Sequence, residues 1–137
     1  MNISEIFVGI DVSKTQLDVA IRPTHEWFQV ANTPEGIAEL VTKLSSRSPT
    51  LITIEATGGY ERDVAVTLAT QGWAVAVVNP RHARAFARAL GLLAKTDRLD
   101  AAMLALFGER VRPPARPPKP EDLQRLDALV SRRRQLI

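Results

Sequence analysis

The run Leu51–Glu55 (LITIE) is the feature that most narrows the folds open to this chain. It is almost continuously apolar and ends in an acid. Strands buried on both faces have this composition, and they are typical of parallel sheets covered by helices on both sides. The run Trp73–Val78 (WAVAVV) has the same character. We therefore expect two buried, parallel strands.

Three more strands are expected before these two. Ile6–Asp11 is rich in β-branched and aromatic residues, and Trp27–Ala31 has a similar composition. Thr15–Ile21 alternates apolar and polar residues, as a strand with one buried face does. Only a short turn separates the first two segments, so we expect them to pair as an antiparallel hairpin.

Helices are predicted between and after the buried strands. Pro34–Leu44 has helical apolar spacing, with Thr33 as a candidate N-cap. The other predicted helices are Tyr60–Thr70, Pro80–Leu90 and Thr96–Glu109. The order β-β-β-α-β-α-β-α-α predicts an α/β fold, with a mixed β-sheet flanked by helices.

The last part of the chain has a different composition. Residues 113–120 (PPARPPKP) contain five prolines, which predicts an extended, semi-rigid linker after a domain of residues 1–112. Residues 121–137 are predicted to start a coiled-coil-like helix. A truncated heptad pattern and a frayed terminal helix both remain open. The heptad positions are Leu123, Leu126, Val130, Arg133 and Ile137.

Composition excludes several classes of protein. The chain has no Cys and two His, so disulfides, a thiol nucleophile and a Cys-built zinc site are excluded. The longest apolar run is too short to span a bilayer, and no signal peptide is recognisable, so we expect a cytoplasmic protein without membrane contact.

Positive charge is concentrated at the end of the chain. Residues 1–109 hold 10 basic and 12 acidic residues, whereas residues 110–137 hold 8 basic and 3 acidic ones. This asymmetry is consistent with a nucleic-acid-facing segment or with a solvated basic tail.

Four acids occupy positions where core elements begin or end: Asp11, Glu55, Asp97 and Asp100. Asp11 and Glu55 close two strands, and Asp97 and Asp100 are three residues apart on a predicted helix, so they would share a face. Carboxylates that converge at one edge of a sheet favour Mg²⁺ or Mn²⁺. Two such ions can act on a phosphodiester.

Each of these acids also has a purely structural interpretation. Asp11 suits a turn, Glu55 suits a loop, Asp97 could cap a helix, and Asp100 could be solvated or paired. Asp18 is expected to be solvated on the polar face of its strand. The helix dipole accounts for the first-turn acids Glu61 and Asp63.

Two further features have open interpretations. Residues 57–60 (TGGY) form a glycine-rich strand-to-helix turn, which could place amides against a phosphate or be a tight turn without a ligand. Arg81, Arg84 and Arg88 form a stripe on one helix face, suited either to a nucleic-acid backbone or to solvent.

The segments FVGIDVSKTQLDVAI, IEATGGYE, VNPRHARAFARALG and AKTDRLDA resemble the N-terminal domain of the DEDD transposases of bacterial insertion sequences. That family includes pilin-gene invertases and bridge-RNA-guided recombinases. The resemblance covers roughly residues 5–110. It implies a RuvC-like, ribonuclease H-like fold.

The same resemblance implies roles for individual residues. Asp11, Glu55, Asp97 and Asp100 would be the catalytic tetrad that binds Mg²⁺ or Mn²⁺. Family members carry a second, C-terminal domain with a nucleophilic Ser, and they act as oligomers. The chain ends before such a domain, so we expect the fragment alone to lack strand-exchange activity.

Three functions follow from these features. The first is the catalytic domain of a DNA transposase that acts on DNA, with a guide RNA and a homodimer or homotetramer formed through the C-terminal helix. In it, Lys14, Arg81, Arg84 and Arg88 would contact nucleic-acid backbone. The second is an ATPase fragment of the actin-like or sugar-kinase type. The third is a non-catalytic nucleic-acid-binding and dimerisation module.

Overall fold

The computed structural model describes residues 5–93, 99–117 and 119–124. Its elements follow the predicted order. They are β1 (Phe7–Val12), β2 (Gln16–Arg22), β3 (Glu26–Ala31), α1 (Pro34–Ser45), β4 (Leu51–Glu55), α2 (Arg62–Thr70), β5 (Val75–Val78), α3 (Pro80–Ala89) and α4 (Ala101–Val111).

The strands form one five-stranded sheet in the order β3-β2-β1-β4-β5. β1, β2 and β3 form an antiparallel meander, whereas β4 is parallel to both β1 and β5. The mixed sheet and the antiparallel hairpin are therefore confirmed. All five residues of β4 are buried, as its composition predicted.

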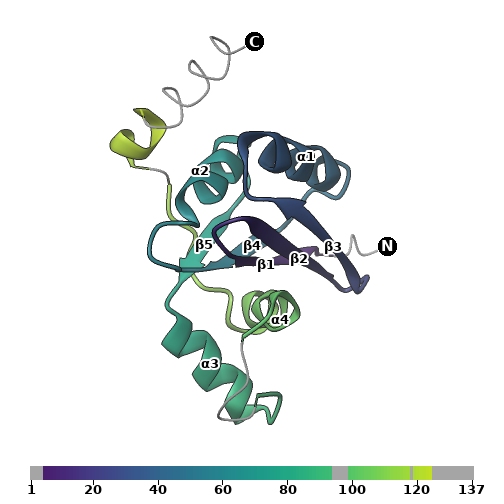
Figure 1. Cartoon of the computed structure of the whole chain (residues 1–137). Helices are drawn as coiled ribbons and strands as arrows, with labels where there is room; N and C mark the ends of the chain where they lie inside the picture. The colour runs from purple at the N-terminus through teal and green to yellow at the C-terminus, as the bar shows by residue number, and fades with distance from the viewer. Residues whose placement is uncertain (1–4, 94–98, 118, 125–137) are drawn as a thin grey trace.

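Helices cover both faces of the sheet (Figure 1). α1 and α2 lie on one face, and α4 lies on the other with α3 beyond it. Alternate residues of β1 supply the two cores: Val8 and Ile10 pack with side chains of α1 and α2, whereas Phe7 packs with side chains of α3 and α4. Each side of the sheet thus has its own apolar core.

α1 begins at the cap that its sequence favours, whereas α2 begins later than predicted. The Thr33 hydroxyl accepts a hydrogen bond from the Gly36 amide, and Pro34 takes the first position of α1. α2 begins at Arg62 rather than Tyr60. Gly58 and Gly59 have φ values of +79° and +122°, which a right-handed helix does not accommodate.

Two glycines allow α4 to lie unusually close to the sheet. A Cβ on Gly9 of β1 would lie 2.1 Å from the Ala101 carbonyl oxygen and 2.3 Å from the Ala105 amide nitrogen. A Cβ on Gly108 of α4 would lie 2.3 Å from the Thr53 hydroxyl of β4. At these two positions, helix and strand therefore touch through backbone atoms at Gly9 and through the Thr53 side chain at Gly108.

The chain turns back along the sheet after α4. Arg112 adopts a left-handed conformation (φ 52°) before Pro113, which ends the helix. The Arg116 amide donates to the Val75 carbonyl oxygen at 3.2 Å, so part of the proline-rich segment lies along the free edge of β5. Residues 120–124 are helical. Of the heptad positions, Leu123 is described and exposed, and the others lie outside the described residues.

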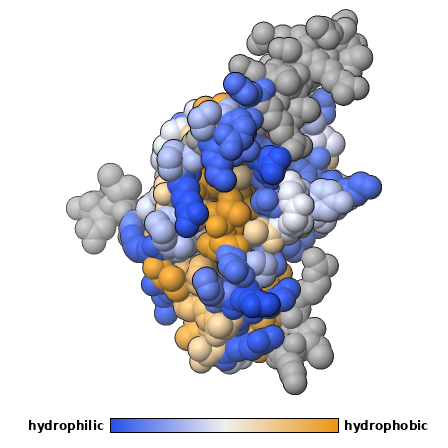
Figure 2. Space-filling view, turned by 90° about the vertical axis from the view of Figure 1, so that its left-hand side faces the viewer, coloured by the Kyte–Doolittle hydropathy of each residue, from blue (hydrophilic) through white to orange (hydrophobic). Residues whose placement is uncertain are grey.

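The side of the molecule that carries α2, β5 and α3 exposes apolar side chains (Figure 2). Val77 of β5 is half-exposed, and so are Leu90 and Leu92 after α3. Over the described ranges, no helix combines the length and the apolar character needed to cross a bilayer.

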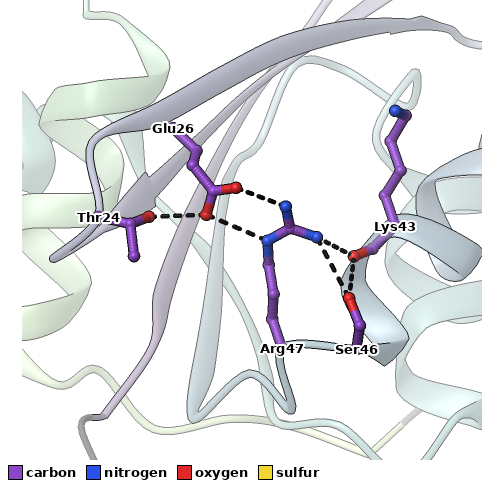
Figure 3. Close-up of polar contacts among 5 residues, drawn as sticks. All are labelled: Thr24, Glu26, Lys43, Ser46 and Arg47. Carbon is purple, nitrogen blue, oxygen red and sulfur yellow. Dashed lines mark hydrogen bonds and ion pairs between the residues drawn. The ribbon is translucent and has the colours of Figure 1, made fainter.

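An ion pair joins the start of β3 to the turn that follows α1 (Figure 3). The Arg47 guanidinium donates to both carboxylate oxygens of Glu26, with Nε 3.1 Å from Oε2, and the Thr24 hydroxyl donates to the same carboxylate at 2.7 Å. These bonds, the one from Arg47 first, lower the pKa of Glu26 to about 2.

We predict that Arg47→Ala raises the pKa of Glu26 from about 2 toward its ordinary value of 4.5, measured by NMR titration. Because the pKa of Glu26 is lower in the folded chain than in the unfolded one, its stabilising effect is complete above about pH 4.5. That effect is lost as the pH falls toward 2. Lys43→Ala, a nearby change of equal charge, should leave the pKa of Glu26 in place. A Glu26 that titrates normally in the unaltered chain would contradict the prediction.

We predict that Gly9→Ala costs about 3 kcal/mol or more of unfolding free energy, because the new methyl group would meet backbone that cannot move aside. Gly108→Ala should be relieved by Thr53→Ala, since the obstacle there is one side-chain hydroxyl. Urea denaturation of the single and double variants should give a coupling energy of at least about 1 kcal/mol between positions 53 and 108. Unchanged stability of Gly9→Ala would refute the close contact.

Candidate metal centre

Two predicted site residues lie side by side at the carboxyl ends of β1 and β4. The parallel register pairs Ile10 with Ile54, so the next residues along, Asp11 and Glu55, are neighbours on the same face. Gly9 identifies that face, because it contacts α4 and lies two residues before Asp11. Glu55 is 9% exposed, and Asp11 is partly buried.

Asp100 is not on a helix face but caps one, which corrects the prediction of a helix from Thr96. It has an extended conformation (φ −114°, ψ 175°), and its carboxylate accepts from the Met103 amide at 2.9 Å. An Asp side chain satisfies a free amide of the first turn better as an N-cap than from within the helix. Asp97 lies outside the described residues.

The approach of α4 to β1 brings this cap toward the strand ends. Ala101, the first residue of α4, has its carbonyl oxygen against Gly9, which lies two residues before Asp11 in β1. Asp100 directly precedes Ala101. The start of α4 therefore lies on the same face and toward the same edge of the sheet as Asp11.

Asp18 lies on the polar face of β2, as expected, but it also lies beside the candidate site. Antiparallel pairing sets Asp18 directly opposite Asp11, and residues so paired share a face with Cβ atoms about 5 Å apart. The side-chain amides of Gln16 and Gln29 donate to one Asp18 oxygen at 2.8 and 2.9 Å. Asp18 is thus held by protein donors beside the candidate site. The signal that indicates this position of Asp18 is the register of the hairpin formed by β1 and β2.

Glu55 also faces a cation. The Arg84 guanidinium of α3 lies with Nη2 4.0 Å from the Glu55 carboxylate. Of the predicted arginine stripe, Arg84 is the half-buried member that reaches this site, whereas Arg81 and Arg88 are exposed. Lys14 is exposed in the turn between β1 and β2.

The glycine-rich turn after β4 is stabilised from within the protein. One Glu61 oxygen accepts from the amides of Thr57 and Gly59 and from the Thr57 hydroxyl, at 2.8 to 3.0 Å. These bonds outweigh burial, and the pKa of Glu61 is lowered. Two amides that a phosphate would need are therefore engaged, which favours the tight-turn interpretation.

Asn32 connects this turn to the other loop at the same edge. Its side-chain amide donates to the Ser13 carbonyl oxygen at 2.9 Å and to the Tyr60 carbonyl oxygen at 3.1 Å. The turn that carries Lys14 and the glycine-rich turn are thereby held together. Nothing in the sequence pattern indicated this role for Asn32.

The arrangement is suited to oxygen-ligand chemistry, although it is incomplete as described. Across the described ranges, no three acidic or histidine side chains lie close enough together to hold one ion. The neighbouring pair of Asp11 and Glu55 supplies carboxylate oxygens, the ligand type that Mg²⁺ and Mn²⁺ prefer. The donor chemistry therefore fits a hard divalent cation.

The mixed sheet, with acids at the ends of two adjacent parallel strands, defines a ribonuclease H-like fold of the RuvC type. The chain is similar to RuvC of T. thermophilus, solved in complex with a Holliday junction substrate, with a TM-score of 0.59 and 16% sequence identity. The match covers 82% of this chain and 99% of that one. At this identity the likeness concerns the fold alone.

Sequence relatives identify the family. A DEDD transposase family model, described as "Transposase", matches residues 8–137. Pilin gene-inverting proteins of Moraxella lacunata and Moraxella bovis are 33% identical over 144 residues, covering 98% of this chain and 45% of each relative. The chain belongs to the DEDD transposase family, and it spans about half the length of these curated relatives.

We predict that Glu61→Ala loosens the turn at residues 57–60 and costs about 1–3 kcal/mol of unfolding free energy, because three hydrogen bonds to one carboxylate are lost. Hydrogen exchange at the Thr57 and Gly59 amides should accelerate. Glu61→Gln keeps an acceptor oxygen and should show a smaller change. Equal exchange rates in Glu61→Ala and the unaltered chain would contradict the assignment.

Proposed function

We propose that this chain is the metal-dependent nuclease domain of a DNA transposase, with Asp11, Glu55, Asp97 and Asp100 as its catalytic and metal-binding residues. The observation that carries the proposal is the register that makes Asp11 and Glu55 neighbours at the ends of β1 and β4. The family supports it, since the chain matches a transposase family model over residues 8–137.

In this proposal the carboxylates hold Mg²⁺ or Mn²⁺ against the scissile phosphate. A bound divalent cation would polarise the phosphodiester and lower the pKa of the attacking hydroxyl or water. Asp11 and Glu55 would each supply ligand oxygens from a rigid strand end, and Asp100 from the cap of α4. Asp18 would add negative potential one strand away while its protein donors hold it in place.

The basic side chains around this edge would hold the nucleic acid. Lys14 is exposed in the turn after β1, and Arg81 and Arg88 are exposed on α3. Contacts of this kind with phosphates fix the position of a strand without reading its bases. Arg84 lies closest to the acids through its pairing with Glu55.

Three further assignments belong to the proposal. Residues 1–112 would be the catalytic domain, residues 113–120 a linker, and residues 121–137 the start of an oligomerisation helix that forms a dimer or tetramer. The relatives are named for the inversion of a pilin gene. This chain would contribute cleavage chemistry to such a reaction in the cytoplasm, with a guide RNA as a partner and a second, Ser-bearing domain required for activity.

We predict that the chain binds Mn²⁺ weakly, and that Asp11→Asn or Glu55→Gln weakens binding at least about tenfold, because each removes a charged ligand. The double variant Asp97→Ala plus Asp100→Ala should do the same. Calorimetric titration measures the affinity. Asp63→Asn is a control acid on α2, on the opposite face of the sheet, and should bind like the unaltered chain. Equal affinities throughout would refute the site.

Salt-dependent DNA binding that ignores the loss of all four acids would favour the non-catalytic module instead. Metal-dependent hydrolysis of ATP would favour the ATPase interpretation. Both measurements can be made on the same set of variants.

A further inference from the structure

Two arginine–glutamate pairs of this chain differ in whether hydrogen bonds join the two side chains. Arg47 grips both oxygens of Glu26 through hydrogen bonds (Figure 3), the bidentate geometry of a strong pair. Arg84 lies 4.0 Å from Glu55, beyond hydrogen-bonding distance. The pair of Arg84 and Glu55 at the candidate metal centre is therefore an electrostatic contact, whereas the pair of Arg47 and Glu26 is joined by hydrogen bonds.

Arg84 also carries an unused donor. Its Nε is shielded from solvent and has no hydrogen-bond partner within the part of the chain that the structure describes. A buried donor without an acceptor costs free energy that a suitable oxygen would restore. The Arg84 side chain as a whole is 43% exposed, so it borders both Glu55 and the solvent.

The backbone of Arg84 is fixed although its side chain is loosely held. Ala83 and Ala87 of α3 are buried against the core on the α4 side of the sheet. Phe86 packs edge to face against Phe107 of α4, with ring centroids 5.4 Å apart. Rotation of its own side chain is therefore the simplest way for this guanidinium to change partners.

We propose that Arg84 is an exchangeable counter-ion. It neutralises Glu55 while the site holds no metal, and it turns to a non-bridging phosphate oxygen of the bound nucleic acid when a divalent cation takes the carboxylate. This inference rests on the proposed function and adds a specific role for one arginine. Arg81 and Arg88, exposed on the same helix, would make ordinary backbone contacts.

Competition for one carboxylate is the physical basis of the exchange. A cation that binds Glu55 must displace the guanidinium, so Arg84 weakens metal binding in the absence of nucleic acid. A phosphodiester beside the metal offers two non-bridging oxygens, to which the planar guanidinium fork can donate a pair of hydrogen bonds, one of them from the buried Nε. Nucleic acid should therefore strengthen metal binding through Arg84.

The test compares Arg84→Gln with Arg62→Gln, which makes the same charge change at an exposed position of α2, on the opposite face of the sheet. Calorimetry measures the Mn²⁺ affinity of the full 137-residue chain with and without a short DNA duplex. Without DNA, Arg84→Gln should bind Mn²⁺ about fivefold more tightly than the unaltered chain, the effect of roughly 1 kcal/mol for a unit charge 4 Å away in water. Arg62→Gln should match the unaltered chain.

With DNA present, the order should reverse. DNA should strengthen Mn²⁺ binding by the unaltered chain and by Arg62→Gln, and this gain should be absent in Arg84→Gln. Arg84→Lys retains the charge without the fork, so it should bind Mn²⁺ like the unaltered chain when DNA is absent and lose most of the gain when DNA is added. This variant decides the question if Arg84→Gln fails to fold.

Three results would overturn the inference, and they have different consequences. Equal Mn²⁺ affinities of Arg84→Gln and Arg62→Gln, or an undiminished DNA effect in Arg84→Lys, would remove the exchange and leave the nuclease proposal standing. A lack of Mn²⁺ binding in the unaltered chain and in every variant would overturn both proposals.

Discussion

The close contact between Gly9 of β1 and the first turn of α4 is the constraint on which the rest of the structure depends. A hydrogen in place of a side chain lets the Ala101 carbonyl and the Ala105 amide lie against the strand. Gly108, about one turn after Ala105, permits the same closeness over Thr53. α4 therefore crosses the sheet at backbone distance. Its N-terminal cap, Asp100, is carried toward the edge of the sheet at which β1 and β4 end.

This edge of the sheet gathers negatively charged side chains, and other side chains of the protein face them. Asp18, Asp11 and Glu55 follow one another across three adjacent strands on one face. Amide donors hold Asp18, and the guanidinium of Arg84 faces Glu55. Neighbouring carboxylates repel unless cations or hydrogen-bond donors face them, so this row suits a site where metal, guanidinium and phosphate exchange places. Away from this site, Arg47 instead donates hydrogen bonds to both carboxylate oxygens of Glu26, as in an ion pair that only stabilises the fold.

Most of the fold could be predicted because it depends on local periodicity. The alternation of Thr15–Ile21 and the apolar run of β4 indicated their strands, and Thr33 and Pro34 indicated the start of α1. The start of α4 could not be predicted in the same way. Whether Asp100 caps the helix or continues it depends on which amide its carboxylate meets. The role of Asp18 likewise required the register of the hairpin.

The sequence by itself determined the order of the strands and helices, the choice of acids at the ends of β1 and β4, and the family, because these depend on residue type and spacing along the chain. Tertiary structure alone decided which groups meet. It set Asp18 against Asp11, engaged the amides of the glycine-rich turn with Glu61, and singled out Arg84 from the arginine stripe. Strand register and helix packing bring these residues together. The periodicity of one segment cannot predict such contacts, because it carries no information on how far that segment lies from another.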